Sequence, residues 1–99
     1  MGAATFVTRS RTADANAAFN ECVERARYEY GNGGYTGSIA EKNSFKLATE
    51  DILPTKEARR LANKILDDDN DNMFSDKYGP AGAIQLQEGG WLFFGWASE

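Results

Sequence analysis

Residues 15–30 constrain the fold most strongly, because their apolar residues recur at intervals of three and four. The series consists of Ala15, Ala18, Phe19, Cys22, Val23, Ala26 and Tyr30. This spacing places the apolar side chains on one face of an α-helix of about four turns, and that face is expected to be buried. We expect Thr12 to cap the helix, with Asp14 in its first turn, and Gly31 to end it.

A second amphipathic stripe follows Pro54. Its apolar residues again step by three and four, at Ala58, Leu61, Ala62, Ile65 and Leu66. We expect this second helix to begin either with Thr55 as its N-cap or with Pro54 as its first residue.

Four further segments have the character of β-strands. Residues 3–10 are rich in β-branched and aromatic residues, and residues 38–47 predict either a short hairpin or one bulged strand. Residues 84–87 alternate apolar with polar, as in a half-buried strand, after a turn-rich approach at 78–82. Gly89-Gly90 predicts a hairpin turn. Residues 91–96 are apolar on both faces, which indicates a central strand or one whose second face meets a partner.

The order of these elements is β-α-β(β)-α-β-β. It predicts one α+β domain over residues 1–99, in two layers, with a mostly antiparallel sheet and two amphipathic helices. Because 99 residues bury a limited core, we also expect a homodimer interface to contribute to stability.

Composition excludes several classes of function. The chain has no histidine, which removes histidine-based catalysis and histidine-containing zinc sites, and Cys22 is its one cysteine, so it forms no intrachain disulfide. A net charge of −4 argues against a general nucleic-acid partner. The sequence shows neither a signal peptide nor an apolar run long enough to span a membrane, so we expect a cytoplasmic protein without a membrane partner.

The glycine-rich segment behind the first helix is the main candidate for a binding site. Four glycines and two tyrosines lie within residues 30–38, and neither a phosphate-loop nor a dinucleotide-binding pattern is present. Glycine lets a ligand approach the backbone closely, so amides and aromatic rings here would hold a polar or anionic ligand. The alternative interpretation is a helix stop followed by a tight turn. The candidate ligand-binding residues, with two nearby cations, are Tyr30, Asn32, Gly33, Gly34, Tyr35, Thr36, Gly37, Lys42 and Arg27.

Patterns for metal binding and catalysis are incomplete. Asp67, Asp69 and Asp71 alternate as in a calcium loop, but Asn72 and Tyr78 stand where that loop needs glycine and glutamate. No spacing selects a catalytic pair among the carboxylates Glu41, Glu50 and Asp51. We therefore expect neither a metal nor a cofactor nor an enzymatic activity, and a small hydrolase is the weakest of the candidate functions.

Three segments carry a resemblance to a known family. They are YEYGNGGYTGSIAEK at 28–42, KYGPAG at 77–82 and WLFFGWA at 91–97. Together they resemble a family of small hypothetical proteins from bacteriophages, especially those of actinobacteria. That family has no firmly assigned activity, so the resemblance implies a phage protein in the bacterial cytoplasm and transfers no catalytic residue.

These observations together predict a non-enzymatic, dimeric binding protein. Its ligand would be a nucleotide-type or other phosphate-containing small molecule, and capturing a nucleotide immune signal would make it a counter-defence factor. The alternative is a protein–protein inhibitor of a host defence complex, similar to an anti-CRISPR protein, acting through the aromatic C-terminal strand or the acidic surface.

Overall fold

The computed structural model describes residues 2–31, 36–67, 74 and 78–98. Its elements follow the expected order, and residues 38–47 form a short 3₁₀ helix and one short strand, instead of either the hairpin or the single bulged strand that the sequence predicted. In chain order they are β1 (Ala3–Ser10), α1 (Ala15–Tyr30), the 3₁₀ helix η1 (Ile39–Glu41), β2 (Phe45–Leu47), α2 (Thr55–Leu66), β3 (Ala81–Gln85) and β4 (Trp91–Ser98).

The four strands form one sheet in the order β1-β4-β3-β2. β4 is antiparallel to both of its neighbours, and β2 runs parallel to β3. The predicted α+β class, with a mostly antiparallel sheet and two helices, is therefore confirmed. β4 lies inside the sheet, which is the first of the two possibilities that the sequence of residues 91–96 left open.

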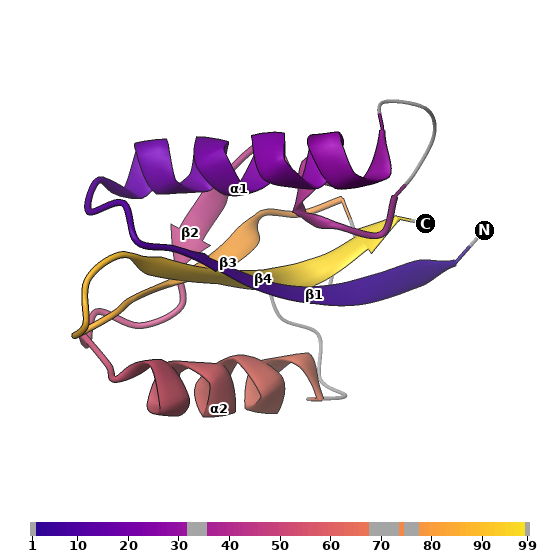
Figure 1. The fold of residues 1–99 in the computed structure, drawn as a ribbon. Helices are drawn as coiled ribbons and strands as arrows, with labels where there is room; N and C mark the ends of the chain where they lie inside the picture. The colour runs from indigo at the N-terminus through magenta and orange to yellow at the C-terminus, as the bar shows by residue number, and fades with distance from the viewer. Residues whose placement is uncertain (1, 32–35, 68–73, 75–77, 99) are drawn as a thin grey trace.

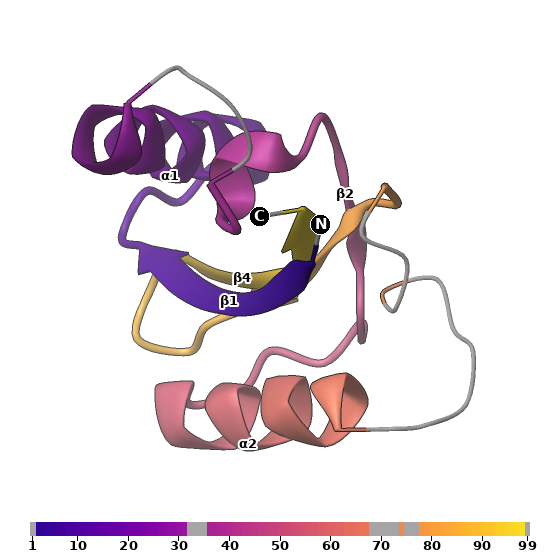
Figure 2. The same cartoon turned by 90° about the vertical axis from the view of Figure 1, so that its right-hand side faces the viewer.

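The helices lie on opposite faces of the sheet, so the domain has three layers instead of the expected two (Figures 1 and 2). The alternation of β4 explains the arrangement. Trp91 and Phe93 belong to the core beneath α1, whereas Leu92 and Phe94 belong to the core beneath α2. Both faces of β4 are apolar, and each is covered by one helix.

α1 begins two residues later than predicted, with Asp14 as its N-cap in place of Thr12. The Asp14 carboxylate accepts the N–H of Ala17 at 2.9 Å. The predicted stripe is confirmed from Ala18 to Ala26, because Ala18, Phe19, Cys22, Val23 and Ala26 are all buried, and Ala15 is partly buried. The rings of Phe19, Phe45 and Phe93 meet beneath it with centroids 5.2–5.5 Å apart.

α2 begins at Thr55, and the preceding Pro54 supplies no capping side chain. Neither predicted start is therefore correct. Ala58 and Ala62 are fully buried, and Leu66 is 8% exposed. The two alanines allow the helix to lie close to Ile84, Leu92 and Phe94 of the sheet.

β3 starts earlier than expected, because Ala81 and Gly82 belong to the strand and not to a turn. A Cβ at Gly82 would overlap the ring of Phe94, so glycine here makes room for that ring. The predicted hairpin turn at Gly89 and Gly90 is confirmed, and both have positive φ, at 104° and 88°. Among the described residues, no helix is both long enough and apolar enough to cross a membrane.

Candidate functional site

The described part of the glycine segment is held tightly by the protein itself. Gly31 has a φ of 83° and donates its N–H to Arg27 O at 2.8 Å, which ends α1. Gly37 donates its N–H to Ser98 O at 2.7 Å, which ties the segment to the end of β4. Asn32, Gly33, Gly34 and Tyr35 lie outside the described residues, as does the side chain of Tyr30.

Thr36 is bound by Glu41 through two groups. The Thr36 N–H and hydroxyl donate to Glu41 Oε2 at 3.1 and 2.9 Å. The Thr36 and Ser38 hydroxyls are 2.6 Å apart, and Ser38 Oγ accepts the Ala40 N–H at 3.2 Å to cap η1. The amides of Thr36 and Gly37 are thus both bonded within the protein, and Glu41 shapes this turn.

The two cations expected beside the segment lie in different environments. Lys42 is 3% exposed, and its Nζ donates to Gly79 O at 2.8 Å. This bond joins the end of η1 to the residues just before β3. Arg27 is exposed on α1. Neither residue borders the cleft described next.

A cleft of about 350 Å³ opens between α1 and β1, beside the described end of the glycine segment. The sequence prediction included Gly37 among its lining residues but missed the rest. The lining comes from β1, from residues 22–29 of α1 and from residues 37–39, and comprises Thr5, Phe6, Val7, Thr8, Cys22, Arg25, Ala26, Glu29, Gly37, Ser38 and Ile39.

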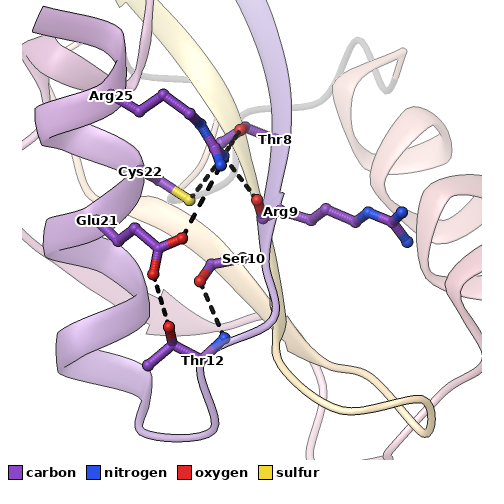
Figure 3. Close-up of polar contacts among 7 residues, drawn as sticks. All are labelled: Thr8, Arg9, Ser10, Thr12, Glu21, Cys22 and Arg25. Atoms are coloured by element: carbon purple, nitrogen blue, oxygen red, sulfur yellow. Dashed lines mark hydrogen bonds and ion pairs between the residues drawn. The ribbon is translucent and has the colours of Figure 1, made fainter. Parts of the chain in front are cut away.

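Arg25 is the cation among the described residues that line this cleft. Its polar contacts are drawn in Figure 3. Its Nη2 donates to Arg9 O at 2.7 Å, to Thr8 Oγ1 at 3.1 Å and to Cys22 Sγ at 3.5 Å. Its Nη1 lies 4.0 Å from Glu21 Oε1, and 46% of the side chain stays exposed. The guanidinium therefore joins α1 to β1 and still faces solvent.

Hydrogen bonds and burial shift two neighbouring pKa values in opposite directions. The Thr12 hydroxyl donates to Glu21 Oε2 at 2.6 Å, and together with Ser10 and the nearby Arg25 it lowers the pKa of Glu21. Burial raises the pKa of Cys22, and Arg25 only partly opposes that effect. Cys22 is consequently a neutral thiol at the base of the cleft, and an unactivated one.

Arg25 was not among the residues that the sequence predicted for the site. The signal was its position: Glu21, Arg25 and Glu29 follow one another at intervals of four, which aligns them along one flank of α1. The apolar stripe of α1 alone did not show which flank of the helix faces β1.

Among the candidates that the structure describes, the remaining ones do not gather into a catalytic or metal site. Glu41 bonds Thr36, while the exposed Glu50 and Asp51 lie in the connection before α2. No group of three potential metal-ligating residues occurs among the described residues. Of the calcium-like run, only Asp67 is described.

No protein-family model matches this chain, and searches of curated proteins and of solved structures find no significant match. The resemblance to phage proteins therefore remains an expectation from the sequence.

Proposed function

We propose that this chain is a non-enzymatic binding protein that holds a small phosphate-containing ligand, nucleotides first among them, in the cleft between α1 and β1. The observation that carries the proposal is the position of Arg25, a half-exposed guanidinium at a cleft of about 350 Å³. That volume falls within the usual range for small-molecule sites.

The chemistry of the lining supports a polar, anionic ligand. A guanidinium binds phosphate oxygens through charge-assisted hydrogen bonds, and Arg25 replaces Lys42 and Arg27 in that proposed role. Thr8 and Ser38 contribute hydroxyls, whereas Phe6, Ala26 and Ile39 contribute apolar surface. Glu29 also borders the cleft, so we expect a ligand with a polar or cationic group as well as an anionic one.

In a phage setting, capture of a nucleotide signal would serve counter-defence in the host cytoplasm. The rival proposal is inhibition of a host protein through the aromatic strand or the acidic surface. Apart from the partly exposed Trp96, the aromatic strand offers little surface. Trp91, Phe93 and Phe94 are at most 9% exposed, because β4 is covered on both faces.

Isothermal titration calorimetry against nucleotides, cyclic oligonucleotides and inorganic phosphate tests the proposal. Arg25→Gln should weaken binding by about tenfold or more, since a charge-assisted contact is lost. Arg27→Gln is the matched control, with the same change two residues away and outside the cleft, and it should bind as the unaltered protein does. Gly34→Val and Tyr35→Ala report on the rest of the glycine segment.

Two results would contradict the proposal. One is the absence of binding to every member of the panel. The other is an equal loss of affinity in Arg25→Gln and Arg27→Gln, which would place the ligand elsewhere or show only general electrostatic attraction. Urea unfolding of each variant ensures that a lost affinity is not a lost fold.

A further inference from the structure

We propose that a second copy of this chain pairs its β1 with β1 of the first copy, so that the two sheets become one and each cleft gains a wall from the partner subunit. This inference goes beyond the proposed ligand and does not depend on it. It starts from the edge of the sheet.

β1 is the long edge strand, with eight residues against three in β2 at the other edge. All eight pair with β4 in an uninterrupted register, so β1 contains no bulge. It contains neither proline nor lysine. Bulges, proline and lysine are three of the devices that keep edge strands from pairing, and β1 has none of the three. Its one charged residue is Arg9, whose carbonyl binds Arg25.

Two observations show which backbone groups of β1 face outward. In the β3–β4 hairpin, the Leu86 N–H donates to Gly90 O. Because backbone hydrogen-bonding groups point to alternate sides along an antiparallel strand, the N–H and C=O groups of Phe93 and Gly95 point toward β1. The backbone groups of their partners, Thr8 and Phe6, therefore point toward β4. The backbone groups of Thr5, Val7 and Arg9 point away from β4, toward the free edge of the sheet. The bond from Arg25 to Arg9 O agrees, since α1 reaches this carbonyl from the free edge.

The cleft runs along this free edge. Its lining includes four consecutive residues of β1, from Thr5 to Thr8. Consecutive side chains of a strand point to opposite faces, so a cleft that touches all four must also contact the edge of the strand. An added strand would lie on the open side of the cleft.

Charge favours a second copy as the occupant. α1 runs antiparallel to β1, so successive turns of α1 lie above successively earlier parts of β1 (Figure 1). Glu21 bonds Thr12, and Arg25 bonds Thr8 and Arg9. Glu29, one turn further along the same flank, therefore lies toward the N-terminal half of β1.

A two-fold axis at Val7 makes these charges complementary. Antiparallel pairing would set Val7 against Val7 of the partner subunit and Arg9 against Thr5 of the partner subunit. Arg25 then lies near Glu29 of the partner subunit, and the same pair recurs on the other side of the axis. Both pairs are attractive, as an isologous interface requires.

Sedimentation velocity tests the pairing, with ligand absent. The unaltered protein should be dimeric. Val7→Pro should be monomeric, because proline removes an outward N–H that the second copy needs but β4 does not. Val7→Thr is the matched control: it keeps the N–H and a β-branched side chain, and it should remain dimeric.

A charge-reversal mixture provides a test that does not depend on proline. Arg25→Glu alone and Glu29→Arg alone each place like charges together, and each should weaken its own dimer about three- to tenfold, since two exposed pairs are reversed. Mixing the two variants restores opposite charges at both contacts, so a heterodimer should form. Glu24→Arg, which changes an exposed acid outside the cleft lining, should have no such effect.

A monomeric unaltered protein would overturn this inference, as would a dimer that persists in Val7→Pro or a mixture no more dimeric than its components. Calorimetry on the unaltered protein measures nucleotide binding whether the protein is monomeric or dimeric, so failure of the pairing and failure of the ligand proposal are distinguishable.

Discussion

Glu88, in the turn between β3 and β4, caps helix α2 at Thr55. Both carboxylate oxygens of Glu88 lie 3.1 Å from the Thr55 backbone nitrogen. The preceding Pro54 offers no side-chain acceptor, so the cap comes from 33 residues further along the chain. A negative charge at this position also suits the helix dipole. The contact joins the hairpin to the layer beneath the sheet.

We expect Glu88→Gln to destabilise the protein, because the substitution removes the negative charge and leaves one acceptor oxygen in place of the two that now face the Thr55 N–H. Urea unfolding followed by circular dichroism should show a lower midpoint. Glu24→Gln, which removes a carboxylate from the exposed surface of α1, is the control and should leave the midpoint unchanged. Equal midpoints for all three proteins would contradict the capping role.

The same contact predicts a pH dependence. The Thr55 hydroxyl and N–H lower the pKa of Glu88, so the folded protein binds this proton less readily than the unfolded chain. Its stabilisation is complete above the unfolded pKa, near 4.5, and is lost as pH falls through the lowered folded pKa. The difference in free energy of unfolding between the unaltered protein and Glu88→Gln should therefore become smaller below that pH. A gap that widens on acidification would contradict this assignment.

A matched pair of glycines separates backbone strain from steric exclusion. Gly31 and Gly90 have φ values of 83° and 88°, but a Cβ at Gly31 meets nothing within 4 Å, whereas a Cβ at Gly90 would overlap Ser10 O. Gly31→Ala should cost about 1–2 kcal/mol from strain alone. Gly90→Ala should cost about 1–3 kcal/mol more, because the backbone of β1 must shift. Equal losses in urea unfolding would contradict the difference.

Lys42 is expected to act in stability and not in ligand binding. Lys42→Met keeps most of the buried aliphatic chain but removes the bond to Gly79 O, and we expect a loss of about 1–3 kcal/mol. Ligand affinity, measured by calorimetry below the unfolding transition, should stay unchanged because Lys42 does not border the cleft. A selective loss of affinity without a loss of stability would reverse this assignment.

The thiol of Cys22 should react slowly in the folded protein. It is 1% exposed, and burial raises its pKa, so little thiolate is available at neutral pH. Reaction with a thiol-specific disulfide reagent should be at least about tenfold slower without urea than in denaturing urea, since it requires an opening of the structure. Equal rates in both conditions would show that the cleft admits the reagent to the sulfur.

The fold class was predictable because its main signals are local. The stripe from Ala18 to Ala26, the stop at Gly31 and the two-sided apolar run 91–96 each describe one element without reference to another. The division of the helices between two faces was not predictable in this way. It depends on which face of β4 each stripe covers, and both faces of that strand are equally apolar.

The candidate site was predicted less well, for a related reason. Glycine content marked the neighbourhood of Gly37, but Lys42 and Arg27 were chosen for their closeness in sequence. The cation that borders the cleft, Arg25, is selected by the antiparallel packing of α1 on β1. That packing is a tertiary property, and only the alignment of Glu21, Arg25 and Glu29 hinted at it.

The position of β4 has a consequence for biosynthesis. β4 contacts β1 and β3 directly and carries side chains of both cores, yet it follows all the other elements in the chain. A ribosome makes α1 and α2 before the strand against which both pack. Until residues 91–98 emerge, β1 lacks the strand with which it pairs, and both helices lack part of the sheet that covers their apolar faces. The native sheet therefore forms only after translation has passed residues 91–98.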